Sequence, residues 1–399
     1  MWKRWFLFIL FPVLAAKDTS ENMDSKAISS AIAAFSAKFC NELEKDKSVV
    51  SSPLSAEFVL GLLTLGTTDP AHSELITALG VADDDSIRST FSSVSSKLKA
   101  IKGVTLNVAN KVYIQDGDYE LQPQIKDDAV KVFDAAMEKL NFGDNVSAVK
   151  TINGWVESKT NQKIKDLLPE DSVDSSTRLV LVNALYFKGT WKDKFDPIAT
   201  REQPFHINAN TTVEIPMMYN EADYGFGFSE TLQAQLLEIP YVGEEASMIV
   251  VLPQEIEGLN DVIAKLAAGH DLLADIENMY KTKVQVTLPK FKIETTIDLK
   301  ELLPKLGINA IFHKENSGLT KLLNTDELLY VSKAVQKAFI EVNEEGAEAA
   351  AATAMGVACY SAMIDFEPVP VFLADRPFLA AIFSEGAPYF ISTFRGEQE

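Results

Sequence analysis

The fold of this chain is decided by one stretch near its carboxyl end, Glu341 to Phe378, which reads EVNEEGAEAAAATAMGVACYSAMIDFEPVPVFLADRPF. An acidic pair, Glu344 and Glu345, is followed by Gly346 and then by a run of small residues with a single charge, Glu348. Two interpretations are open. Alanine is the best helix former and Asn343 could cap a helix, so local propensity favours a helix.

The alternative is a spare β-strand that can enter a sheet. Because side chains alternate along a strand, one face would be small and uncharged and Glu348 would lie on the other face. The residues of the small face are Ala347, Ala349, Ala351, Thr353 and Met355. Small side chains displace little volume from a packed interior, and Gly346 provides a permissive pivot. The alternation of the side chains and their small size therefore permit this stretch to enter a sheet as a strand.

This stretch resembles the reactive-centre loop of the serpin family, here about residues 343–366. The run that resembles the hinge of an inhibitory serpin comprises Glu344, Glu345, Gly346, Ala347, Glu348, Ala349, Ala350, Ala351 and Ala352. The segment Asp375-Arg376-Pro377-Phe378 resembles the one that follows the loop. The resemblance implies a bait mechanism, in which a serine protease cleaves the loop, forms a covalent acyl-enzyme and is dragged away as the loop inserts.

In the family, the bait bond lies a fixed distance after the hinge glycine. Counting from Gly346 places it between Tyr360 and Ser361, with a register uncertain by one residue and Met363 as an alternative. An aromatic bait suits a chymotrypsin-like protease, whose primary pocket is a hydrophobic slot. The other interpretation of Tyr360 is an ordinary aromatic residue in an exposed loop.

Composition narrows the class of protein. The chain has 399 residues, is 47% hydrophobic and carries a net charge of −20. It can bury a large core, and without a linker or repeat we expect one domain, 17–399. The strong negative charge argues against nucleic acid, an anionic membrane or a heparin-type ligand as a partner. We expect a monomer whose partner is the target protease.

The first 16 residues read as a signal peptide. Lys3 and Arg4 precede an apolar run, and Ala15 and Ala16 offer a cleavage site, so we expect a secreted, extracellular protein. An uncleaved anchor is the alternative. Two sequons predict glycans at Asn145 and Asn210, with unmodified surface asparagine as the alternative.

Cysteine usage is sparse for a secreted chain. Cys40 lies in a helical pattern and Cys359 lies beside the predicted bait bond. A bridge between them would pin a loop that must move, so we expect free thiols. No cofactor or metal is expected.

Hydrophobic periodicity predicts alternating helices and strands. We expect helices over 24–43, 53–65, 86–101, 123–133, 151–164, two within 259–279, and 299–306. The serpin resemblance implies a further short helix within 66–81. We expect strands over 104–114, 178–189, 211–218, 232–239, 247–252, 284–292, 330–342 and within 378–394. The fold class is α+β, and the serpin resemblance implies three sheets and eight or nine helices.

The resemblance also assigns residues that control opening of the main sheet. Ser52, Ser55 and Asn183 match its shutter, and Trp191 matches the breach where insertion begins. Lys290 matches the lysine that pairs with an acid at the loop base, here Glu344. Gln336 stands where many members have histidine, so a pH-sensing shutter is not expected.

Other functions leave weaker signals. The four histidines show no metal-ligand spacing, and no phosphate-binding loop or nucleophile elbow occurs, so an enzyme is not expected. A non-inhibitory serpin acting as carrier, chaperone or storage protein is the closer alternative. Bulky residues or proline in the hinge would favour it, and this hinge has neither. The expected function is irreversible, suicide-type inhibition of a secreted serine protease, as in insect haemolymph serpins.

Overall fold

The computed structural model describes residues 14–324, 327–347 and 368–396. Nine α-helices occur in these ranges: α1 Leu14–Asn41, α2 Pro53–Leu65, α3 Ala71–Leu79, α4 Asp84–Ala100, α5 Pro123–Lys131, α6 Asn145–Lys159, α7 Leu259–Ala267, α8 Leu272–Glu277 and α9 Leu299–Leu302. No helix in the described part of the chain is long and apolar enough to cross a membrane. The helices, together with the sheets below, confirm an α+β fold.

The strands form two hydrogen-bonded sheets within the described ranges. The six-stranded sheet has the order β10-β11-β4-β2-β3, with β12 paired to β4. Its strands are β2 Val104–Gln115, β3 Ala136–Leu140, β4 Leu179–Thr190, β10 Phe291–Asp298, β11 Val331–Val342 and β12 Gly346–Ala347.

The nine-stranded sheet has the order β1-β15-β14-β8-β7-β6-β9-β13, with β5 paired to β6. Its strands are β1 Val49–Ser51, β5 Arg201–Asn208, β6 Thr211–Ser229, β7 Ala234–Pro240, β8 Ser247–Pro253, β9 Tyr280–Pro289, β13 Val371–Leu373, β14 Phe378–Ser384 and β15 Ala387–Phe394. The expected third sheet is not separate in the described chain. Because β6 is long enough to pair with β5, β7 and β9, it joins the smaller sheets into one.

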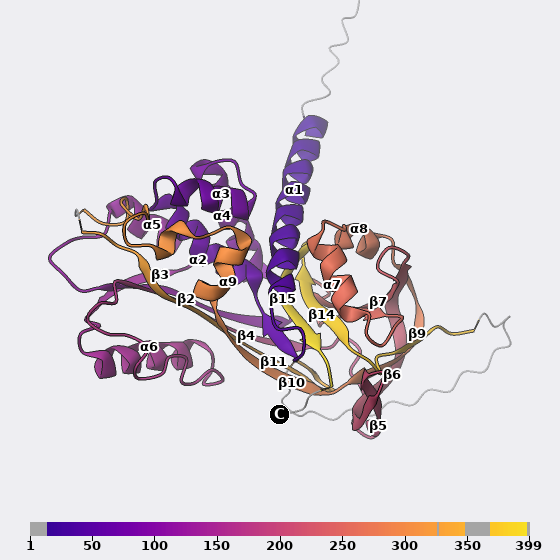
Figure 1. Ribbon diagram of the computed structural model, residues 1–399. Coiled ribbons are helices and arrows are strands. Elements are labelled where there is room, and N and C mark those ends of the chain that lie inside the picture. The colour runs from indigo at the N-terminus through magenta and orange to yellow at the C-terminus, as the bar shows by residue number, and fades with distance from the viewer. Residues whose placement is uncertain (1–13, 325–326, 348–367, 397–399) are drawn as a thin grey trace, which may run out of the picture.

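Helices cover both faces of the six-stranded sheet, with α2, α4 and α5 on one side and α6 on the other (Figure 1). The strand β4 is therefore buried on both faces. Leu181 and Leu185 pack into the main core with α2, whereas Val180 and Val182 pack into a separate core under α6. Burial on both faces explains why this strand reads as a nearly continuous apolar run.

Two helices begin earlier than their hydrophobic pattern predicts. Helix α1 begins at Leu14, not at 24, and α6 spans Asn145–Lys159 in place of 151–164. Asp144 caps α6 by accepting a hydrogen bond from the Ser147 amide at 3.2 Å. Positive φ angles at Asn161 and Gln162 end it. Capping and backbone conformation, which periodicity does not report, set the boundaries of α6.

A buried acid lies in the central helix α2, all of whose residues are buried. Glu57 is 1% exposed, and its Oε2 atom has no hydrogen-bond partner among the described residues. Burial raises the pKa of the Glu57 carboxyl well above its usual value. The neutral, protonated form is therefore the one that suits this site.

Replacing Glu57 by glutamine should stabilise the protein relative to the parent, and the difference should grow as the pH rises. The unfolded chain releases this proton near pH 4.3 and the folded chain only at higher pH, so the parent loses stability above about pH 4.3. Glutamine has nearly the same shape and does not titrate. We expect the variant and the parent to unfold at similar temperatures at pH 4, with the variant increasingly ahead up to pH 8. A variant that stays below the parent by a constant amount at every pH would contradict this.

Candidate functional site

The candidate site is the junction of two parallel strands. Strands β4 and β11 pair directly from Leu179–Val331 to Tyr186–Phe339, and we call this row of pairs the seam. Most other pairs in this sheet are antiparallel or lie at its edge. Parallel pairing is slightly less stable per residue, so the seam is a physically reasonable place for the sheet to part.

A row of three amide side chains crosses the seam. Asn110 on β2 is the register partner of Asn183 on β4, and Asn183 is the partner of Gln336 on β11. The Nε2 atom of Gln336 donates to Asn183 Oδ1 at 2.5 Å, and Asn183 Nδ2 donates to Asn110 Oδ1. All three side chains are buried on the face toward α2. The row links the two sides of the seam through side chains as well as through the backbone.

The first turn of α2 completes this network. The Oε1 atom of Gln336 accepts from the Ser52 amide at 2.9 Å, and its Nε2 donates to the Ser52 carbonyl at 2.8 Å. Ser55 accepts from Asn183 at 2.5 Å and donates to Asn110 at 3.1 Å. Each buried hydrogen bond of this kind contributes about 0.5–1.5 kcal/mol net, and leaving a partner unsatisfied costs more. The arrangement therefore holds the sheet to α2 in one conformation.

The sequence analysis identified Ser52, Ser55, Asn183 and Gln336 as candidate residues but missed Asn110. A signal for it was present. Along β2 the residues that face the main core are apolar, Val112 and Ile114 among them, and Asn110 is the polar exception. A lone amide on the apolar face of a strand needs a buried partner, and Asn183, in the buried strand predicted over 178–189, was a candidate for it.

A tight turn follows β11. The Asn343 amide donates to the Gly346 carbonyl at 2.9 Å, and the Gly346 amide donates back to the Asn343 carbonyl at 3.1 Å. Trp191, fully buried, donates its indole N–H to the same Asn343 carbonyl at 2.9 Å. Its ring stacks on Tyr241 with centroids 4.5 Å apart. The turn is thus fixed to the end of β4 and reverses the chain there.

The acid at the loop base has three partners. Glu344 Oε2 lies 3.0 Å from Lys290 Nζ, and Oε1 accepts from Thr200 at 2.9 Å. Burial on its own would raise the pKa of Glu344, but hydrogen bonds from its own backbone amide, from Lys290 and from Thr200 outweigh burial and lower it. The carboxylate is charged at neutral pH. Because Lys290 is half exposed, the ion pair itself contributes only about 0–1 kcal/mol.

Glycine is required at position 346 by a close backbone approach. Gly346 has φ of +141° and pairs with Thr190 in β12. A Cβ atom there would overlap the Gly189 carbonyl oxygen and lie 2.7 Å from Thr190 Cα. The neighbouring Glu345 pairs with Lys194. The start of the hinge therefore lies against the end of β4, with room only for a glycine.

Several predicted residues lie outside the described ranges: Glu348, Ala349, Ala350, Ala351, Ala352, Cys359, Tyr360 and Ser361. Of the sequon residues, Asn210 is exposed in the turn between β5 and β6. Asn145 is the first residue of α6 and donates to the Glu170 carbonyl at 3.2 Å. Cys40 is a buried free thiol, and burial raises its pKa to about 12.

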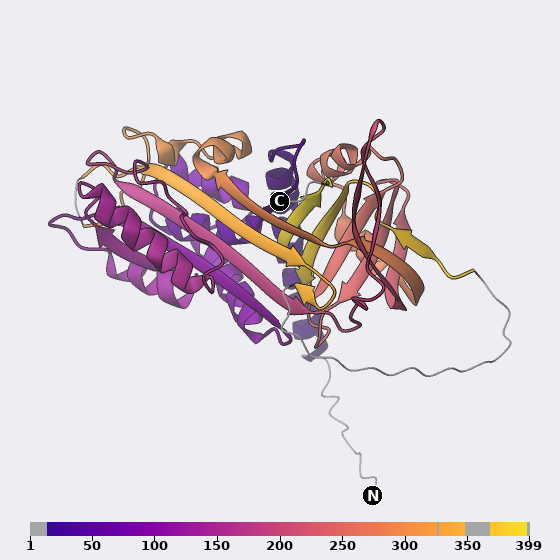
Figure 2. The same cartoon turned by 90° about the horizontal axis from the view of Figure 1, so that it is seen from below.

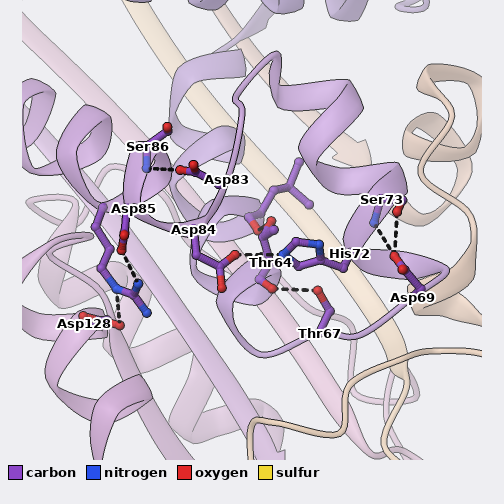
Figure 3. Close-up of polar contacts among 12 residues, drawn as sticks. Thr64, Thr67, Asp69, His72, Ser73, Asp83, Asp84, Asp85, Ser86 and Asp128 are labelled. Carbon is purple, nitrogen blue, oxygen red and sulfur yellow. Dashed lines mark hydrogen bonds and ion pairs between the residues drawn. The ribbon is translucent and has the colours of Figure 1, made fainter.

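A polar cluster between α3 and α4 contains the residue types of a hydrolase triad, in the wrong connectivity (Figure 3). His72 Nε2 lies 2.8 Å from Asp84 Oδ1. The Ser73 hydroxyl donates to Asp69 at 2.6 Å and not to His72. A triad needs the histidine to accept the serine proton, so this cluster does not activate a nucleophile. Within the described ranges, no group of histidine, cysteine and acidic residues could hold a metal ion.

Comparison with known proteins places the chain in a family. The family model for serpins, described as serine protease inhibitors, matches residues 30–395. The chain belongs to the serpin family and is classed with protease inhibitors and not with enzymes.

Similar proteins are found among insect serpins. Antichymotrypsin-2 and antitrypsin of Bombyx mori are each 43% identical over 363 residues, which is 90% of this chain and 96% and 92% of theirs. A crystal structure of Serpin48, described as a highly specific serpin of the insect Tenebrio molitor, superposes with a TM-score of 0.84 and 33% identity. The superposition covers 94% of this chain and 99% of that one.

Replacing Asn183 by leucine should destabilise the native fold. Leucine keeps the volume but removes three buried hydrogen bonds, so we expect a loss of about 1–3 kcal/mol in the free energy of unfolding. Urea denaturation measures it. Ser55→Ala, which leaves the link between Asn183 and Gln336 intact, should cost less. An Asn183→Leu variant as stable as the parent would mean that the amide row does not hold the seam.

Proposed function

We propose that this chain is a suicide inhibitor of a chymotrypsin-like serine protease. The protease cleaves the loop between Tyr360 and Ser361, the Tyr360 carbonyl becomes an ester of the catalytic serine, and the amino group of Ser361 leaves. The loop then inserts into the seam before water can hydrolyse the ester. The observation that carries this proposal is β12, which already pairs antiparallel with β4 at the end of the seam.

The direction of β12 is the one that insertion needs. Because β4 and β11 are parallel, a strand antiparallel to β4 is also antiparallel to β11. It can therefore pair with both strands if they separate. The chain reverses at Asn343–Gly346 and so reaches this position without crossing the sheet.

The register of β12 supports the parity of the hinge. Gly346 pairs with Thr190 and Ala347 with Gly189. Extending this register pairs residues 346–357 with the whole of β4, from Thr190 back to Leu179. Position 353 would then lie opposite Asn183, on the face toward α2, whereas Glu348 would lie opposite Lys188 on the other face. The small face deduced from the sequence is thus the one that would meet the core.

The choice of protease depends on Tyr360. Overall similarity does not decide it, because relatives named antichymotrypsin-2 and antitrypsin are equally identical to this chain. A tyrosine fits a hydrophobic primary pocket, whereas a trypsin-like pocket selects a basic residue.

We also propose that residues 1–16 are removed on secretion, that residues 17–399 act as one monomeric domain, and that Asn145 and Asn210 carry glycans. The net charge of −20 does not favour heparin as a ligand.

Mixing the protein with chymotrypsin tests the proposal directly. We expect a complex that survives denaturing gels, because the ester bond is covalent, and release of a peptide that begins at Ser361. Cleavage at Ser361 without a complex would indicate a non-inhibitory serpin. Lack of cleavage by chymotrypsin, trypsin and elastase would reject the bait mechanism.

Replacing Ala351 by arginine should convert the inhibitor into a substrate. The charge would enter the core on insertion, so deacylation should overtake trapping. We expect the stoichiometry of inhibition to rise by at least about tenfold, since burying an unpaired charge costs several kcal/mol. Glu348→Arg is the matched control because that position faces away from the core. If both variants lose inhibition equally, the proposed register of insertion is wrong.

Replacing Tyr360 by lysine should move specificity to trypsin-like proteases. Lysine places a cation in a pocket that is apolar in chymotrypsin and acidic in trypsin. We expect the association rate constant to fall with chymotrypsin and to rise with trypsin, each by at least about tenfold. If neither rate changes, the bait lies elsewhere, and Met363→Lys is the next variant to measure.

A further inference from the structure

A buried lysine lies beneath α6. Lys111 on β2 is 7% exposed. Its neighbours on the same strand face, Ala109 and Tyr113, belong to the core under α6. Lysine is almost never buried to this extent without a partner. The trapping mechanism proposed above does not use this residue, so its role needs a separate explanation.

The ammonium group of Lys111 has three partners. It lies 2.5 Å from Glu138 Oε2, a residue of the edge strand β3. It also lies 4.8 Å from the ring centroid of Tyr113 and 4.8 Å from that of Trp155 on α6. The two rings meet edge to face, with centroids 6.4 Å apart. A cation shielded from water beside an aromatic face is strongly attracted to it. Lys111 therefore attaches α6 to β2.

The segment that follows α6 is attached to the other side of the seam. Lys337 on β11 donates to the Lys165 carbonyl at 2.9 Å. Lys163 Nζ lies 5.8 Å from the ring centroid of Phe339, also on β11. Phe339 and Val335 complete the core under α6. Figure 2 shows α6 in magenta lying over the strands of this sheet. The helix and its following segment thus form a strap across the seam.

Inserting a strand must disturb this strap. Neighbouring strands lie about 4.8 Å apart, so admitting one between β4 and β11 moves them apart by about that distance. Attachments to both sides cannot remain unchanged. We propose that Lys111 is a positioning residue that holds α6 across the seam and so sets the rate at which the seam admits a strand. This inference rests on the proposed function, because it concerns the same seam.

The test measures strand uptake without a protease. The probe is an acetylated synthetic peptide with the sequence of residues 346–357, GAEAAAATAMGV. Its incorporation into the intact protein is followed by the change in thermal unfolding temperature with time. Lys111→Met keeps the apolar stem and removes the cation, and we expect about tenfold faster uptake. Lys111→Arg keeps the cation and should restore the parent rate.

Coupling to Trp155 identifies the mechanism. Trp155→Phe should accelerate uptake in the parent, and adding Lys111→Met to it should change the rate by less than twofold, because both substitutions remove the same contact. Lys139→Met is the matched control. Lys139 lies 4.9 Å from the ring centroid of Tyr119, away from α6. Its loss should lower the unfolding temperature without accelerating uptake.

Three results would overturn the inference. The first is that Lys111→Met takes up the peptide no faster than the parent, which includes the case in which neither protein takes it up. The second is that Lys139→Met accelerates uptake as much as Lys111→Met does. The third is that the effects of Lys111→Met and Trp155→Phe on the uptake rate are fully additive. A protein that forms no complex with chymotrypsin but shows the expected uptake rates would refute only the proposed function.

Discussion

The structure depends on the direct pairing of β4 with β11. These parallel strands come from distant parts of the chain and meet at the centre of the six-stranded sheet. Backbone hydrogen bonds hold them together, and three further attachments lie along the same line. The amide row ties the seam to α2, the turn at Asn343–Gly346 covers one end, and α6 with its following segment crosses the other face. A change at the seam therefore affects most of the molecule.

Amides are suited to a junction that opens and closes again around a new strand. A well-packed apolar row would often be at least as stable, but it would offer the new strand nothing to recognise. Asn183 and Gln336 are satisfied by each other in the closed sheet and would need new partners once separated. In the proposed register, Thr353 lies opposite Asn183 and brings a hydroxyl that both donates and accepts. In the proposed mechanism, the polar row would therefore favour one register of insertion over its neighbours.

The groups at the seam do not respond to moderate changes in pH. Asn110, Asn183 and Gln336 do not titrate, and the pKa of Glu344 lies below its usual value, so the ion pair with Lys290 persists at neutral pH. The trigger in the proposed mechanism is covalent, because cleavage releases the loop from its distal attachment. The strap formed by α6 and its following segment then sets how fast the sheet responds. In this mechanism the loop sets the specificity for the protease, whereas the sheet and α6 set the rate of strand insertion.

The sequence alone determined the α+β fold class, the buried strand β4 and the helix α2, and it supplied the proposed parity of the hinge. These follow from local rules, because periodicity, capping and alternation depend on neighbouring residues. Only the tertiary structure decided what depends on register between distant strands. It aligned Asn110 with Asn183 and Gln336, joined the smaller sheets through β6, and placed Lys111 under Trp155. A local pattern shows which face of a strand is buried, but not which residue of another strand lies opposite, because that choice is made by packing over the whole core.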